Sequence, residues 1–340
     1  MYDMSTNDSR EKPLVLVTGA TGFIGGHLLK GLVLVGYRVR ALCRTPVSDD
    51  DIEGLEWVQT EGLSPKTDWN EFLDGVDSVV HLAALAHESN QSRKSSDDAY
   101  YQVNAGVTEA LVTAVRDNGS IRRMIFLSTI GVIATTSSLV VDEKTPCNPD
   151  TVYAKSKLEA EERIQSVLSG SGTDWCILRP PVVYGPGNPG NMDRLRKLVL
   201  TGIPLPFGSI CNQRSFIYVG NLSGIIIHVI GFPAKLNRVY CVADNQSLST
   251  PELINLICQA VDRSDRCWPC PLWLLGMLGH GGDFFRSVFG TDPGINSYSV
   301  ERLVGSLAID AASIHKELQW RPPFTIEEGL VETFGSGKSH

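Results

Sequence analysis

The stretch Leu14-Val-Leu-Val-Thr18-Gly19-Ala-Thr-Gly22-Phe-Ile-Gly25 decides the fold of this chain. Its apolar start predicts a short buried strand, and three glycines at intervals of three residues lead directly into a helical pattern. Glycine lacks a Cβ and tolerates positive φ, so the backbone can turn tightly and lie against a phosphate. The N–H groups and the positive dipole end at the helix start then bind that anion. The combination predicts a dinucleotide-binding turn, with a strand-to-helix turn that binds nothing as the alternative.

Strand-like and helical patterns alternate along the first half of the chain. The expected strands are at 14–18, 37–42, 78–82, 124–128 and 175–178, and the expected helices at 27–35, 104–117 and 153–168. Such alternation predicts an α/β fold, a Rossmann-type doubly wound parallel sheet with helices on both faces. Ligands of such folds bind at the carboxyl ends of the strands.

The pattern changes after Arg179, where prolines and glycines cluster and indicate loop structure rather than sheet. Later segments are shorter, and residues 238–242 predict a strand that returns to the large sheet. The expected segments are, in order, a disordered tail (1–12), an NAD(P)-binding Rossmann domain (13–180), a smaller α/β substrate-binding lobe (181–330) and a second tail (331–340).

Charge and composition exclude several classes of protein. The net charge of −8 and the lack of a basic run argue against a nucleic-acid partner. The eight cysteines show no disulfide-like spacing and no signal peptide is recognisable, which together predict a cytoplasmic protein with free thiols. The apolar stretches 222–232 and 268–278 are too short or too interrupted to span a membrane. A packed helix is expected at 268–278, with contact to a membrane surface as the alternative. The Cys267-x-x-Cys270 pair predicts structural cysteines rather than a metal or redox site.

The end of the second strand bears on the choice of cofactor. An NAD-binding fold usually places an acidic residue there to accept hydrogen bonds from the adenine ribose. Here Cys43 cannot accept them, and Arg44 beside it can pair with a 2′-phosphate. This favours NADP(H) over NAD(H), with an ordinary surface arginine as the alternative.

The chemistry is predicted at Ser128, Thr129, Tyr153 and Lys157. Tyr153 and Lys157 are one helical turn apart and therefore share a face. A nearby lysine cation is expected to lower the phenol pKa and to make Tyr153 a usable acid or base for carbonyl–alcohol interconversion. The hydroxyl of Thr129 or Ser128 would hold the substrate oxygen. His81, between apolar neighbours, predicts a packed histidine rather than a proton carrier.

These motifs, with Leu178-Arg-Pro-Pro-x-Val-Tyr-Gly185, resemble the extended short-chain dehydrogenase/reductase family, and more narrowly its NAD-dependent epimerase/dehydratase branch. The resemblance implies that Tyr153 is the acid/base, Lys157 its partner and Thr129 the substrate hydroxyl. It also implies that the helices of Asn104 and Tyr153 pair in a homodimer. Gly62, before Leu63, stands where an adenine-contacting Asp is common. The implied cofactor site comprises Gly19, Thr21, Gly22, Phe23, Ile24, Gly25, Arg44, Leu63, Leu82, Ala83, Ala84, Asn104, Tyr153, Lys157, Pro180 and Val183.

The second half resembles the nucleotide-sugar sites of this branch and implies a UDP-sugar substrate that contacts Asn191, Phe207, Arg214 and Arg302. Guanidinium groups suit the diphosphate because they present a rigid fork of donors. The main reading is a reductase of a UDP-4-keto-6-deoxy-(N-acetyl)hexosamine. The alternatives are a UDP-hexose 4-epimerase with tightly bound NAD, a catalytically silent NAD(P)-sensing protein, and a reductase of small apolar ketones.

Overall fold

The computed structural model describes residues 13–47, 52–86, 97–188, 190–264, 267–289 and 297–335, and the tail expected at 1–12 lies outside them. Over these residues the main sheet is parallel, with seven strands in the order β3-β2-β1-β4-β5-β6-β9. The strands are β1 (Leu14–Thr18), β2 (Arg38–Cys43), β3 (Leu55–Gln59), β4 (Ser78–His81), β5 (Arg123–Leu127), β6 (Asp174–Arg179) and β9 (Arg238–Cys241). The predicted Rossmann-type doubly wound sheet is therefore confirmed.

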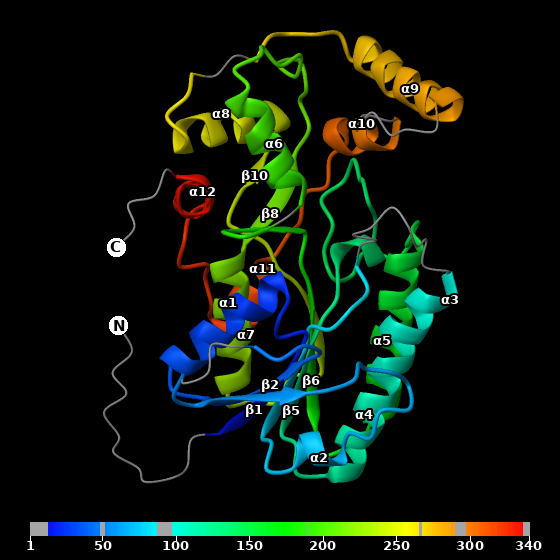
Figure 1. The fold of residues 1–340 in the computed structure, drawn as a ribbon, viewed down its shortest axis with the longest axis vertical. Coiled ribbons are helices and arrows are strands. Elements are labelled where there is room, and N and C mark those ends of the chain that lie inside the picture. Colours follow the sequence, from blue (N-terminus) through cyan, green and yellow to red (C-terminus); the bar gives the residue numbers. More distant parts are fainter. Residues whose placement is uncertain are drawn as a thin grey trace.

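Helices cover both faces of this sheet (Figure 1). The side chains of β1 alternate between the two layers, because successive residues of a strand point to opposite faces. Val15 and Val17 belong to the core with α1, α7 and α11, whereas Leu14 and Leu16 pack with α2, α4 and α5. The elements of these layers are α1 (Phe23–Leu34), α2 (Asn70–Leu73), α3 (Asp97–Tyr100), the π-helix η1 (Tyr101–Gly106), α4 (Val107–Asn118), the 3₁₀-helix η2 (Ile130–Val132), α5 (Val152–Leu168), α7 (Val219–Gly231) and α11 (Ala312–Leu318).

A second lobe lies beyond the carboxyl ends of the strands (Figure 1). It has a small sheet in the order β10-β8-β7, with its own core shared with α6, α8 and α12. Helix α12 runs to Phe334 and so extends into the segment predicted as a tail. The elements are β7 (Val182–Tyr184), α6 (Asn191–Leu200), β8 (Arg214–Tyr218), β10 (Ser247–Leu248), α8 (Thr250–Ala260), α9 (Leu272–Phe289), α10 (Ser297–Val304) and α12 (Ile326–Phe334).

The sequence patterns missed four of the described strands, β3 in the main sheet and β7, β8 and β10 in the small sheet, and they found the returning strand. β3 is an edge strand with no fully buried residue, so it lacks the apolar run that marks the other strands. β7 follows Pro181 directly, in a segment predicted as loop, and it pairs with β8. The returning strand predicted at 238–242 is β9, which pairs with β6 in the main sheet.

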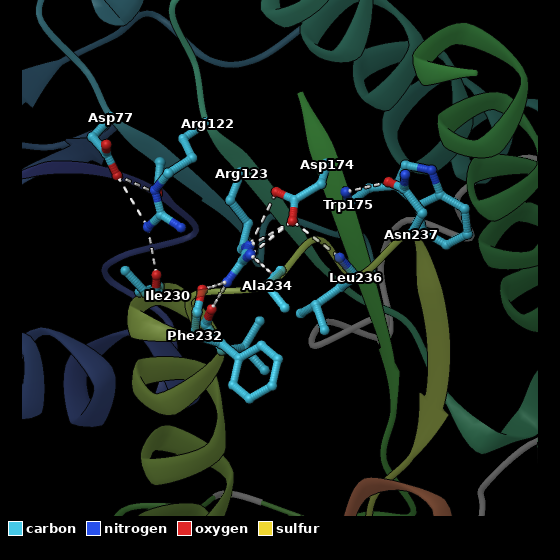
Figure 2. Close-up of polar contacts among 12 residues, drawn as sticks. Asp77, Arg122, Arg123, Asp174, Trp175, Ile230, Phe232, Ala234, Leu236 and Asn237 are labelled. Carbon is cyan, nitrogen blue, oxygen red and sulfur yellow. Dashed lines mark hydrogen bonds and ion pairs between the residues drawn. The ribbon is translucent and has the colours of Figure 1, made fainter. Parts of the chain in front are cut away.

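The amino-terminal edge of the sheet is fixed by a buried ion pair (Figure 2). Arg123 opens β5 and Asp174 opens β6, and their closest N–O distance is 2.7 Å with both side chains almost fully buried. Arg123 also donates hydrogen bonds to the carbonyls of Val229, Phe232 and Ala234, at the carboxyl end of α7. The guanidinium therefore satisfies helix-end carbonyls that have no partner within the helix.

The apolar segment expected as a packed helix is α9, which packs through Leu275 against Ile210 and Cys270. Its other side leaves Trp273 66% and Met277 61% exposed. No described helix combines the length and hydropathy that a membrane span requires. Neither Cys267 nor Cys270 takes part in a disulfide. In the described ranges, no three His, Cys, Asp or Glu side chains are placed to hold a metal ion.

Candidate active site

The glycine turn after β1 forms a cradle with little space for side chains. Gly19 has φ +70°, and a Cβ there would lie 2.7 Å from the backbone nitrogen of Ala83. A Cβ on Gly25 would collide with the carbonyls of Gly19 and Ala20. Gly22 is the N-cap of α1, which has neither a capping side chain nor an acidic residue in its first turn. The helix N-terminus therefore presents its N–H groups to an external anion, and the cradle fits the diphosphate of a dinucleotide.

The other predicted cofactor residues are spread along the carboxyl edge of the sheet. Thr21 is exposed in the turn, while Phe23 and Ile24 begin α1 and are partly buried. Leu82, Ala83 and Ala84 follow β4, and the Ala83 N–H donates to the Thr18 hydroxyl at 3.2 Å. Buried Pro180 follows β6, and Val183 lies in β7.

At the end of β2, Cys43 is buried and its thiol contacts the Val58 carbonyl at 3.7 Å. Arg44 is exposed, and its backbone carbonyl accepts a hydrogen bond from Gln59. No carboxylate side chain ends this strand, so an adenine ribose there would meet a thiol and a guanidinium. Leu63 is partly buried against the core on the α4 face.

Asn104 lies in the π-helix η1 and is almost fully buried. Its side chain accepts a hydrogen bond from the Leu85 N–H at 2.7 Å and donates to the Leu85 carbonyl at 3.1 Å. It also donates to the Ser156 hydroxyl on α5 at 2.9 Å. Asn104 thus connects the loop after β4 to the helix that carries Tyr153, and π-bulges of this kind are frequent at functional sites.

His81 is the packed histidine that the sequence predicted. Its ring is fully buried between the hydroxyls of Thr18, at 2.6 Å, and Thr108, at 3.0 Å. Burial and the charge of Lys157 lower the His81 pKa to about 3. The imidazole is therefore neutral at physiological pH and adds no positive charge to the site.

Tyr153 and Lys157 occupy the first two turns of α5, whose N-terminus is capped by the Thr151 hydroxyl. Lys157 is buried, and its ammonium nitrogen lies 3.8 Å from the centre of the Phe126 ring. Burial lowers the Lys157 pKa to about 7, against the opposing charge of Glu161. Burial also raises the pKa of Tyr153 to about 12. The expectation that Lys157 lowers the Tyr153 pKa is therefore wrong for the protein alone, in which desolvation dominates and the phenol is a proton donor.

The two candidate hydroxyls after β5 differ in their surroundings. Ser128 is buried and its hydroxyl donates to the carboxylate of Glu161, while its role as a substrate hydroxyl stays a prediction. Thr129 is partly exposed and caps η2 by accepting from the Gly131 N–H at 3.1 Å. A Cβ on Gly131 would lie 3.4 Å from the Thr129 hydroxyl and 3.6 Å from the Cβ of Ala154. Gly131 therefore lies between the Thr129 side chain and the start of α5 at Ala154.

Sequence reasoning missed the buried pair Glu161–Arg179. Arg179 ends β6 and binds both carboxylate oxygens of Glu161, with Nη2 at 2.6 Å from Oε2. A glutamate four residues after Lys157 lies on the same helical face, and this spacing was the available signal.

The predicted phosphate ligands Arg214 and Arg302 come together in the second lobe. Arg214 donates to the carbonyls of Arg302, at 3.1 Å, and Gly305, at 2.9 Å. Burial and the charge of Arg302 lower the Arg214 pKa to about 10. Phe207 is partly buried between two small cores. Asn191 begins α6, and its side chain lies outside the described part of the structure.

Backbone hydrogen bonds join the loop after β5, which contains Thr129, to the segment that contacts Arg214. The chain runs from Thr129 through η2 to Ser137, whose N–H donates to the Ser306 carbonyl at 2.7 Å. Leu307, which follows Ser306, pairs with β8, where the Ser215 N–H donates to the Leu307 carbonyl at 3.0 Å. Leu307 also forms a bridge with Arg214. The loop after β5 therefore contacts the segment that positions the arginines.

Comparison with known proteins agrees with this geometry. The model of the NAD dependent epimerase/dehydratase family matches residues 15–243. UDP-glucose 4-epimerase from Vibrio cholerae is 34% identical over 334 residues, which cover 97% of each chain. N-acetyl-alpha-D-glucosaminyl-diphospho-ditrans,octacis-undecaprenol 4-epimerase from Escherichia coli O157:H7 is 28% identical and covers 94% of this chain and 93% of its own. The structure of UDP-N-acetylglucosamine 4-epimerase from Bacillus cereus has a TM-score of 0.73 at 21% identity, with 94% and 98% covered, and shares the fold. The chain therefore belongs to the NAD dependent epimerase/dehydratase family and is an NAD-dependent enzyme of the extended short-chain dehydrogenase/reductase type.

Proposed function

We propose that this enzyme is a 4-epimerase of a UDP-linked hexose or N-acetylhexosamine. The observation that supports it best is the partly buried Arg214 guanidinium, which donates to the backbone carbonyls of Arg302 and Gly305 and whose pKa is lowered to about 10 by burial and by the charge of Arg302. Two adjacent cations raise each other's free energy unless an anion lies between or beside them. A sugar diphosphate supplies such an anion, whereas a small apolar ketone does not. The names of the Vibrio cholerae and Escherichia coli relatives agree with a 4-epimerase of a sugar diphosphate.

The proposed roles follow from the surroundings of each side chain. A bound nicotinamide dinucleotide supplies the hydride acceptor and donor for carbon 4 of the sugar. As a phenolate, the form that a charged Lys157 favours, Tyr153 removes the proton of the 4-hydroxyl, and as a phenol it returns that proton to the ketone oxygen. Thr129 donates a hydrogen bond to that oxygen. Lys157 places a positive charge beside the reacting phenol, and Arg214 and Arg302 hold the diphosphate.

The test is interconversion of UDP-glucose and UDP-galactose, or of their N-acetylated forms, by purified enzyme without added nicotinamide. We expect the same equilibrium ratio from either starting sugar. Arg214→Met should raise KM by about 10- to 100-fold because a charge-assisted contact of about 1.5–3 kcal/mol is lost. No interconversion of any of the four UDP-sugars would overturn the proposal.

A second candidate, the 4-ketoreductase, is favoured by the end of β2. Cys43 and exposed Arg44 present no carboxylate for an NAD ribose, and this chemistry suits a 2′-phosphate and an NADPH that is consumed in each turnover. The reductase predicts stoichiometric loss of NADPH absorbance with a UDP-4-keto-6-deoxy-N-acetylhexosamine. The epimerase predicts turnover with no net change in absorbance. A homodimer through α4 and α5 stays a prediction, which sedimentation can test.

A further inference from the structure

The carboxylate of Glu161 is fully buried in the catalytic core and has no role in the mechanism described above. It lies on α5, one turn beyond Lys157, with the turn of Tyr153 before that. Arg179 binds it from β6, with Nε at 3.0 Å from Oε1 and Nη2 at 2.6 Å from Oε2. Ser128, directly after β5, donates its hydroxyl to the same carboxylate.

Side-chain packing alone does not require a buried ion pair and a hydrogen bond at Glu161. A buried carboxylate has a large desolvation cost, and replacing a buried ion pair by apolar side chains often leaves stability unchanged. The polar group therefore has to be explained by something other than stability. On the same face of α5, one turn before Glu161, lies Lys157, which is buried against the ring of Phe126.

The charges around Lys157 act in opposite directions. Burial disfavours the ammonium form, and the negative charge of Glu161 favours it. His81, from β4, is neutral and therefore contributes no charge beside Lys157. Tyr153, on α5 itself, holds its proton. Further titratable groups lie nearby. Arg179 of β6 is bound to Glu161, and the Cys147 thiol lies 3.4 Å from Arg179 Nη2. The thiol of Cys241, at the end of β9, is protonated.

We propose that Glu161 is a positioning residue of the catalytic core: held by Arg179 and Ser128, its carboxylate favours the charged form of Lys157 and fixes α5 to the ends of β5 and β6. Arg179 and Ser128 then act through Glu161 and touch no substrate. The functional part of this inference rests on the proposed role of Lys157 beside Tyr153. The electrostatic part does not depend on which sugar the enzyme uses.

The decisive experiment measures the titration of Lys157 directly. Protein labelled with ¹³C-lysine is titrated by NMR, and the Lys157 side-chain signal is assigned by its loss in Lys157→Arg. In Glu161→Gln we expect the titration midpoint to fall by at least about one pH unit, because a charge that opposes desolvation is removed. Glu162→Gln, the same change on the exposed side of the same helix, should leave the midpoint unchanged. An unchanged midpoint in Glu161→Gln would overturn the proposal.

Glu161→Gln leaves Arg179 buried without its partner and can fail to fold. The double variant E161M/R179M removes both charges at similar volume and should fold, and its midpoint should lie below that of the wild type by less than in Glu161→Gln, because a cation is removed with the anion. A wild-type midpoint in the folded double variant would also overturn the proposal.

Kinetics provide the functional readout. In Glu161→Gln the fall of kcat/KM with rising pH should begin at lower pH, whereas a purely structural defect lowers kcat/KM equally at every pH. A uniform loss would refute the functional part of the inference. If wild-type enzyme turns over no UDP-sugar, the proposed function fails, and the NMR comparison still decides the electrostatic relationship.

Discussion

The Lys157 ammonium nitrogen lies 3.8 Å above the ring centre of Phe126, and that ring stacks in turn on the imidazole of His81. A cation over an aromatic face gains about 0.5–2 kcal/mol, depending on how far it is desolvated. Since 1.36 kcal/mol corresponds to about one pKa unit, Phe126→Leu should lower the pKa of Lys157 by about 0.4–1.5 units. The measurement is the basic limb of kcat/KM against pH. Phe72→Leu, the same change in α2, should leave that limb in place, and an unmoved limb in Phe126→Leu contradicts the role of the ring.

Tyr153→Phe should reduce kcat by about 10²- to 10⁴-fold, because the proton donor and acceptor of the reaction is removed. The dissociation constant for NAD should change little, since the phosphate cradle lies on α1 and is not touched. Both quantities are measured on the same preparation, by turnover and by calorimetry. Tyr37→Phe, ahead of β2 at the opposite edge of the sheet, is the matched control and should keep normal kcat. Retention of a tenth or more of wild-type kcat in Tyr153→Phe would exclude Tyr153 as the acid/base.

Arg44→Asp should shift the preference between the two dinucleotides towards NADH. The new carboxylate repels a 2′-phosphate and accepts hydrogen bonds from ribose hydroxyls, so the ratio of Kd for NADPH to Kd for NADH should rise by at least about tenfold. Fluorescence titration of the reduced cofactors gives both constants. Arg38→Asp reverses charge at the other end of the same strand and should leave the ratio unchanged. Equal effects on both cofactors would show that Arg44 does not contact the ribose.

Arg123→Met should destabilise the fold by about 3–5 kcal/mol, because Asp174 stays buried without its partner and the α7 carbonyls lose their donor. Urea unfolding monitored by circular dichroism provides the free energy. Arg116→Met breaks an exposed pair with Asp117 and should cost at most about 1 kcal/mol. Because Arg123 lies at the amino edge of the sheet, kcat per folded molecule should stay normal. A loss below 1 kcal/mol would contradict the importance of this pair.

Asp244, after β9, makes stability depend on pH in an unusual direction. Burial raises its pKa to about 6, although it accepts hydrogen bonds from Tyr184, the Tyr218 N–H and Asn221. Between pH 4 and 6 the native state therefore binds more protons here than the unfolded chain, and this contribution to stability is lost as pH rises. The unfolding free energy of wild type minus that of Asp244→Asn should fall by on the order of 2 kcal/mol over that range. A difference that rises with pH would show that Asp244 is stabilised as a carboxylate.

Much of the main sheet could be predicted because its strands are short apolar runs that end at recognisable residues. Gly19 and Gly25 stand where any Cβ would collide with backbone, so their spacing carries direct information about close approach. β3 could not be predicted in this way, because an edge strand with partly exposed residues has no distinctive period.

The candidate site was predictable where its residues share one helix and less so where they meet across the fold. Tyr153 and Lys157 show their relation by spacing alone, but the balance between desolvation and charge that sets their pKa values depends on burial. The surroundings of Ser128 and Thr129 differ because Ser128 donates to Glu161. In the sequence, nothing distinguishes Glu161 from other helical glutamates. Arg214 and Arg302 were both expected at a phosphate, and their contact depends on a segment pairing across 88 residues.

The return of β9 to the main sheet has a mechanical consequence. The segment from β7 through α7, which includes Arg214, is anchored at both ends in neighbouring parallel strands, β6 and β9. A lobe entered and left through two neighbouring strands can move only by a motion that both crossings share. A proteolytic nick between β6 and β9 would leave Arg214 held from one side only, and it should loosen the placement of this arginine without unfolding the main sheet.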